Sequence, residues 1–168
     1  KERKSKTMKE YTESKSLSLS QIVLGAVGIV GGIWMIAAPF VLNYSGIKVL
    51  DAATKKQVSA DLGAVTASDI VVGVLLILVG IAALLVTNSK VLYQLQRVAV
   101  IGAIVIGIYL MAAPYIFDLL KIAEYLGIDK PNTNDQLMGI LSVIAGGFAY
   151  QQKFGQVVEV DGAGEALP

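Results

Sequence analysis

The stretch GIWMIAAPF at residues 32–40 decides the fold, because it returns as GIYLMAAPY at residues 107–115. Five of the nine positions are identical, and the two copies align without a gap. A second match pairs residues 68–75 with residues 134–141, at a somewhat shorter offset. Self-similarity of this kind marks a repeated structural unit. The sequence therefore predicts two tandem copies of one unit, of which the first has the longer internal loop.

Each copy of the unit holds two stretches without a charged residue. A helix that crosses a bilayer needs about 20 mostly apolar residues, and these stretches reach or approach that length. Hydrophobic residues make up 55% of the 168-residue chain and charged residues only 16%, against about 25% charged in soluble domains. The uncharged stretches are residues 21–42, 70–89, 98–117 and 136–152.

This pattern predicts an all-α membrane protein with four transmembrane helices, arranged as two tandem parallel helix-hairpin repeats. A hairpin of two spans returns the chain to its starting side, so both copies have the same orientation in the membrane. The predicted organisation is a tail at 1–19, repeat 1 at 20–89 (helices at about 20–42 and 69–87, outer loop 43–68), repeat 2 at 90–152 (helices at about 96–118 and 135–152, outer loop 119–134) and a tail at 153–168.

Local signals add detail to this organisation. Ser18 and Gln21 have the spacing of a capping box at the start of the first helix. In the first outer loop, residues 47–50 and 56–59 flank a turn-like stretch and favour a short β-hairpin. In the second outer loop, residues 119–126 carry apolar side chains at helical spacing, which predicts an interfacial helix. Residues 129–132 predict a turn after it.

The distribution of basic residues predicts the orientation. Lys and Arg accumulate on the cytoplasmic side of membrane proteins, and nine of them fall on the side of the termini against five on the opposite side. We therefore expect a multi-pass protein of the cell membrane with cytoplasmic N and C termini. The nine are Lys1, Arg3, Lys4, Lys6, Lys9, Lys15, Lys90, Arg97 and Lys153, and the five are Lys48, Lys55, Lys56, Lys121 and Lys130.

The repeated motif resembles the SPW-repeat family of small prokaryotic integral membrane proteins. The resemblance lies in the aromatic-x4-proline-aromatic end of one helix and in the Asp-x3-Gly that opens the next, and it covers both units. Where that family has Ser-Pro-Trp, this chain has APF at 38–40 and APY at 113–115. The resemblance implies a membrane fold built from the repeat, and it carries over no catalytic or ligand-binding residues.

Spaced glycines are the candidates for helix packing. Small residues let helix backbones approach closely in lipid, and several of these glycines recur at the repeat offsets. Their faces pack either within the chain or against a partner, and the sequence leaves both open. The candidates are Gly28, Gly32, Gly73, Gly80, Gly107, Gly139 and Gly146.

Two further pairs of motif residues recur in the repeat. Pro39 and Pro114 predict kinks near the outer ends of their helices, with a hinge or a lipid-soluble ligand at the freed carbonyls as the alternative. Trp34 and Tyr109 lie deeper than an interfacial aromatic belt. We expect each to pack inside the chain and to bond a neighbouring carbonyl, with contact to a bound lipid, quinone or pigment as the alternative.

Asp69 and Asp135 form the third recurring pair, directly before the second uncharged stretch of each unit. We expect them to start their helices, where a carboxylate is favoured by the helix dipole and Ser68 or Asn134 can cap. An ion-binding pair across the axis that relates the repeats is the alternative.

The composition narrows the function. The chain has no cysteine and no histidine, which removes thiolate chemistry, imidazole ligation and the usual general base near neutral pH. We expect a protein that is not an enzyme and has no cofactor, catalytic or metal site. We expect membrane lipids and other integral membrane subunits as partners, and no nucleic acid.

The predicted function is a non-catalytic structural or accessory subunit of a larger membrane complex. Ionisable groups inside a membrane usually mark function, and the sequence places none in the middle of the four predicted spans. The alternatives are a small oligomeric channel or transporter and a protein that binds lipid or quinone.

Overall fold

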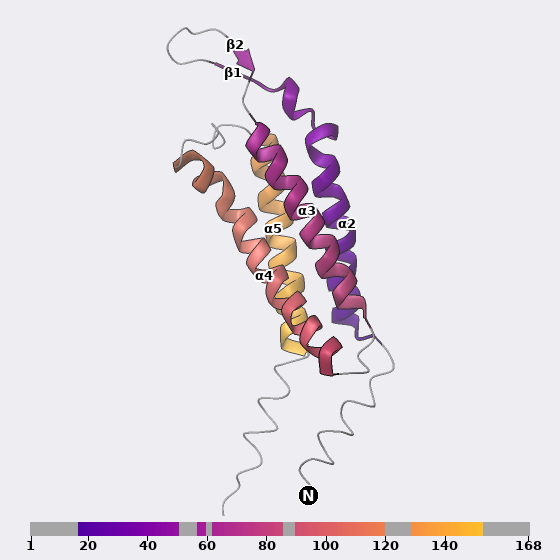
Figure 1. The fold of residues 1–168 in the computed structure, drawn as a ribbon. Helices are drawn as coiled ribbons and strands as arrows, with labels where there is room; N and C mark the ends of the chain where they lie inside the picture. Colours follow the sequence, from indigo (N-terminus) through magenta and orange to yellow (C-terminus); the bar gives the residue numbers. More distant parts are fainter. Residues whose placement is uncertain (1–16, 51–56, 60–61, 86–89, 120–128, 153–168) are drawn as a thin grey trace, which may run out of the picture.

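Four long helices form an elongated bundle in the computed structural model, which describes residues 17–50, 57–59, 62–85, 90–119 and 129–152 (Figure 1). Between α2 and α3 lie a short 3-10 helix and two strands. In chain order the elements are α2 (Leu19–Val41), η1 (Tyr44–Gly46), β1 (Lys48–Leu50), β2 (Gln57–Ser59), α3 (Gly63–Leu84), α4 (Lys90–Leu119) and α5 (Asp129–Tyr150).

Three of the helical segments are long and apolar enough to cross a membrane, namely Leu19–Gly46, Gly63–Leu84 and Val91–Phe117. This composition indicates a membrane protein. The helix α5 has 22 residues and is not among these three segments. It is less apolar than the others because its first two turns are rich in polar residues.

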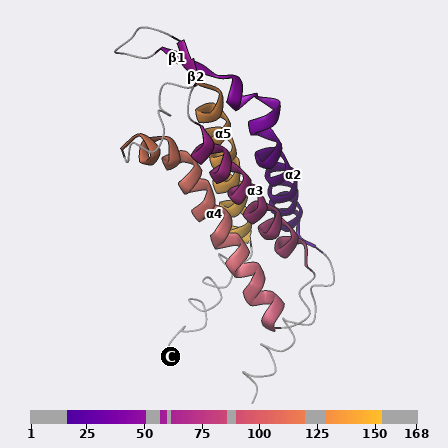
Figure 2. The same cartoon turned by 45° about the horizontal axis from the view of Figure 1, so that its top comes forward.

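The two ends of the bundle differ in character. The start of α2 and the end of α5 lie together at one end, which we call the terminal end (Figure 1). The 3-10 helix and both strands lie at the opposite end, which we call the hairpin end (Figure 2). The strands pair antiparallel with Val49 opposite Val58, which confirms the predicted β-hairpin.

The helix α2 starts where the sequence predicts. The Ser18 hydroxyl accepts a hydrogen bond from the Gln21 backbone N–H at 3.3 Å, and the Gln21 side-chain oxygen accepts one from the Ser18 N–H at 2.9 Å. This reciprocal pair is a capping box. At the other end of α2, Asn43 adopts a left-handed conformation with φ 54°, which ends the helix in the manner usual for Asn or Gly.

Within each hairpin of helices, two glycines allow the backbones to touch. A Cβ atom built on Gly32 of α2 would lie 2.5 Å from the carbonyl oxygen of Gly73 of α3. The same atom on Gly107 of α4 would lie 2.6 Å from the carbonyl oxygen of Gly139 of α5. Because real Cβ atoms do not approach a backbone oxygen so closely, only glycine fits at these crossings.

The remaining candidate glycines also face the partner helix of their own hairpin. A Cβ on Gly28 would lie 2.7 Å from the Cα of Gly80, and one on Gly146 would lie 2.8 Å from the Cγ1 of Ile104. The sequence leaves open whether these faces pack within the chain or against a partner. In the structure they pack within the chain.

Apolar side chains fill the interior between the two hairpins. In the middle of the bundle Met35, Leu76 and Leu110 are at most 1% exposed, and they belong to one cluster. Nearer the terminal end, Leu24 and Val100 pack in a second cluster. The bundle therefore has a solid core along these levels.

Candidate functional site

Two carboxylates are buried in the bundle near its hairpin end. Asp69 of α3 is 0% exposed and Asp135 of α5 is 2% exposed. Each is the seventh residue of its helix, about 9 Å from the helix start at 1.5 Å per residue. Each side chain therefore lies inside the bundle beside the other.

The prediction that these aspartates start and cap their helices is wrong. The cap residue of α3 is Leu62, which makes no side-chain capping bond, and the helix runs for six residues before Asp69. Its first turns form because Val65 packs with Leu62 and Tyr44 in a buried cluster, which extends the helix beyond the uncharged stretch. The expectation that α5 starts at about residue 135 is also wrong, because the helix begins six residues earlier.

The expected turn at residues 129–132 is also wrong, because α5 begins at Asp129. Pro131 then lies in the first turn, where a helix tolerates proline. The expected interfacial helix at residues 119–126 lies outside the described residues except for Leu119, the last residue of α4.

Tyr44 of the 3-10 helix lies beside the two buried aspartates. Its side chain is 2% exposed and interacts with Asp69, Asp135 and Asn134. The Tyr44 hydroxyl and both carboxylate oxygens of Asp69 have no hydrogen-bond partner among the described residues. A buried polar group without a partner costs about 1–3 kcal/mol, so these three oxygens call for an explanation.

Asn134 links the carboxylates to α2. Its side-chain carbonyl accepts a hydrogen bond of 2.7 Å from the indole N–H of Trp34. Its amide nitrogen lies 3.4 Å from a carboxylate oxygen of Asp135 and 3.4 Å from the sulfur of Met35. Trp34 thus bonds a side-chain carbonyl on another helix.

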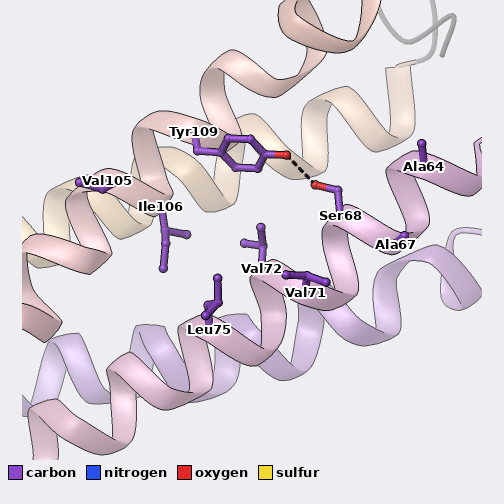
Figure 3. Close-up of a pocket in the computed structure, with 9 residues that line it drawn as sticks. All are labelled: Ala64, Ala67, Ser68, Val71, Val72, Leu75, Val105, Ile106 and Tyr109. Atoms are coloured by element: carbon purple, nitrogen blue, oxygen red, sulfur yellow. Dashed lines mark hydrogen bonds between the residues drawn. The ribbon is translucent and has the colours of Figure 1, made fainter. Parts of the chain in front are cut away.

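Tyr109 makes the corresponding contact on the other side of the bundle. Its hydroxyl lies 3.0 Å from the hydroxyl of Ser68 (Figure 3). In the aligned repeat segments, Tyr109 is the counterpart of Trp34 and Asn134 is the counterpart of Ser68. The aromatic residue of each aligned segment therefore reaches across to the second helix of the other hairpin.

A groove of about 540 Å³ lies beside the Ser68–Tyr109 pair, between α3 and α4. Its walls are apolar apart from these two hydroxyls, which face each other at one edge (Figure 3). The lining residues are Ala64, Ala67, Ser68, Val71, Val72, Leu75, Val105, Ile106 and Tyr109.

The two prolines lie inside helices rather than after them. Pro39 is two residues before the end of α2, and Pro114 is five residues before the end of α4. Both are buried. Each therefore leaves the carbonyl four residues before it without its usual helical partner, as the sequence predicts for a site near the helix end.

The arrangement brings the carboxyl groups of Asp69 and Asp135 and the hydroxyl of Tyr44 together in the interior of the bundle. No group of three or more His, Cys, Asp or Glu residues occurs in the part of the chain that the structure describes. Sequence reasoning found Asp69, Asp135 and Trp34 through the repeat. It missed Tyr44, which lies outside the aligned segments and carries no signal that separates it from an ordinary loop tyrosine.

The fold and the buried cluster define a helical membrane protein with carboxylates inside its bundle. No protein-family model, no curated protein and no solved structure matches the chain. The resemblance to the SPW-repeat family stays a prediction from the repeated motif.

Proposed function

We propose that the chain is a four-span membrane protein made of two tandem parallel helix hairpins, as in the SPW-repeat family that it resembles. Two observations support the repeat: the glycine crossings and the aromatic hydrogen bonds recur at corresponding positions of the two copies. A third supports α5 as the fourth span. Its outward side chains are apolar, with Leu137 57% exposed and Ile144 62% exposed.

We place the protein in the cell membrane with both termini in the cytoplasm. The excess of basic residues on the side of the termini supports this orientation. The terminal end of the bundle then faces the cytoplasm, and the hairpin end with its carboxylates faces outward.

The function that the geometry supports best is a non-catalytic structural or accessory subunit of a larger membrane complex. The observation that carries this proposal is a solid apolar core combined with apolar outward faces on all four helices. A channel within one chain needs a polar passage, whereas Met35, Leu76 and Leu110 close the axis of this bundle. The apolar outward faces of such a bundle can contact lipid and neighbouring apolar helices.

The partners on this proposal are membrane lipids and other integral membrane subunits. The candidate glycines already contact the partner helix of their own hairpin. A helix of another subunit would therefore pack against the larger side chains on an outward face. Val30, Leu78, Ile108 and Ile144 represent the outward faces of α2, α3, α4 and α5, and each is at least 53% exposed.

Site-specific photocrosslinking tests the proposal in native membranes. A photoreactive residue is placed singly at Val30, Leu78, Ile108 or Ile144. An accessory subunit should give one discrete foreign protein adduct at one or two adjacent faces, and native mass spectrometry should find the same protein in a fixed ratio. Lipid adducts alone at all four positions, together with a lone monomer or homo-oligomer, would contradict it. The four positions serve as controls for one another because each lies on the outward face of a different helix.

The groove between α3 and α4 favours a second candidate, the binding of a lipid or quinone. An apolar wall with two hydroxyls at one edge matches a long apolar molecule with a polar head group (Figure 3). Replacing Val105 with Trp fills the groove, and it should remove a lipid-like molecule that copurifies with the wild-type protein. The same molecule in equal amount in both preparations would exclude this site.

A further inference from the structure

The oxygens of Asp69 and Tyr44 form a cluster of buried polar atoms that the packing of the bundle does not explain. Asp69 is 0% exposed, and neither of its carboxylate oxygens has a hydrogen-bond partner among the residues that the structure describes. Asp135 lies beside it with 2% exposure. Two carboxyl groups side by side in a low dielectric are costly unless a shared proton or a bound cation compensates them.

The Tyr44 hydroxyl is an independent observation that points into the same space. It comes from a separate element, the 3-10 helix after α2, and it interacts with both carboxylates. It is also buried without a hydrogen-bond partner in the described part of the chain. The 3-10 helix therefore adds a third oxygen atom to the two carboxyl groups.

The ligand set determines the class of ion. Every candidate ligand atom is an oxygen, which selects hard cations, and two carboxylates match the charge of one divalent ion. Magnesium usually keeps several bound waters, whereas calcium accepts flexible geometry and carboxylates that bind through one or both oxygens. Two carboxylates that can each bind through one or both oxygens suit this flexible geometry, so calcium fits better.

We propose that Asp69, Asp135 and Tyr44 form a binding site for one hard divalent cation of the calcium class at the hairpin end of the bundle. The ion would tie together α3, α5 and the segment after α2. The sequence leaves an ion-binding pair of these aspartates only as an alternative, because it places them at the starts of their helices rather than inside the bundle. The site is independent of the accessory role proposed above, because it would bind its ion with or without a partner subunit.

Energy transfer from the single tryptophan provides a way to detect the bound ion. Trp34 is the only tryptophan of the chain, and it bonds Asn134, whose amide lies 3.4 Å from the Asp135 carboxylate. Terbium(III) substitutes for calcium at oxygen sites and emits light when a nearby excited indole or phenol transfers energy to it. We expect saturable terbium emission from the full-length protein in detergent, displaced by calcium and much less by magnesium.

Two variants locate the ion. Asp69→Asn removes one charge and should weaken terbium and calcium binding by about tenfold or more, because affinity follows the number of charged ligands. Tyr44→Phe removes only the hydroxyl and should weaken binding several-fold with the helical circular dichroism unchanged. Ser142→Ala removes another buried hydroxyl that has no partner among the described residues, about 10 Å along α5 from Asp135. It is the matched control and should bind as the wild type does.

Calcium should also raise the midpoint of thermal unfolding of the wild type and of Ser142→Ala, but not of Asp69→Asn. The proposal is overturned if the wild type shows no saturable emission. It is equally overturned if Asp69→Asn and Tyr44→Phe, both folded, bind terbium as tightly as the wild type. If Asp69→Asn fails to fold, Tyr44→Phe alone decides between these outcomes.

Discussion

Trp34 and Tyr109 occupy equivalent positions in the two aligned segments, yet their hydrogen bonds lie in different surroundings. The partner of Trp34 is the amide of Asn134, which is 7% exposed and also contacts Asp135. The partner of Tyr109 is the hydroxyl of Ser68, at the exposed edge of the groove. A hydrogen bond contributes most to stability where its loss leaves a buried polar group without a partner. The two bonds should therefore differ in their effect on stability.

We predict that Trp34→Phe destabilises the protein by about 1 kcal/mol or more, because it leaves a buried amide oxygen without a donor. Tyr109→Phe should cost less than about 0.5 kcal/mol, because water or lipid head groups can reach the freed Ser68 hydroxyl. Unfolding in detergent, followed by circular dichroism, measures both. Equal destabilisation by the two substitutions would contradict the difference in burial.

At the scale of elements, the two hairpins are built on the same kind of crossing. The Gly32–Gly73 and Gly107–Gly139 contacts bring helix backbones together without side chains between them. By contrast, Gly147 of α5 has nothing within 4 Å of a Cβ built on it. Glycine is therefore required at the crossings and only tolerated at residue 147.

We predict that Gly32→Ala and Gly107→Ala each destabilise the protein by about 1–3 kcal/mol, because the added methyl group forces two backbones apart. Gly147→Ala should leave stability unchanged or raise it by up to about 1 kcal/mol through helix propensity. Denaturation of the three variants in one detergent provides the comparison. If Gly32→Ala is as stable as Gly147→Ala, the close crossing is absent.

At the scale of the whole molecule, the two hairpins meet through contacts that are similar without being identical. Met138 of α5 packs against Gly31 of α2, whereas the corresponding positions on the other side hold Val72 and Ile106 beside the groove. A large residue opposite glycine fills one side, and two medium residues leave a groove on the other. In the proposed topology both hairpins cross the membrane in the same direction. Each connection between helices is therefore assigned to one side of the membrane.

We predict that the connection at residues 51–56 is outside the cell and that the connection at residues 86–89 is inside. The chain has no cysteine, so Thr54→Cys and Ser89→Cys each introduce a single thiol. A reagent that does not cross membranes should label Thr54→Cys in intact cells and label Ser89→Cys only after permeabilisation. Labelling of both in intact cells, or the reverse pattern, would overturn the proposed orientation.

Much of the architecture follows from the sequence by itself. The uncharged stretches indicate four helices, and the start of α2 and the β-hairpin follow from capping and turn signals that act within a few residues. Glycines spaced along one face also mark a packing surface without reference to its partner. These features depend on local geometry, which neighbouring residues determine.

Only the tertiary structure decided what the polar residues do. The sequence alone predicts Asp69 and Asp135 at helix starts, whereas α3 and α5 begin six residues earlier, and this shift carries both carboxylates into the bundle. Trp34 meets Asn134 across 100 residues of chain. Such contacts depend on how two hairpins dock, and docking is determined by the summed packing of side chains that are far apart in the sequence.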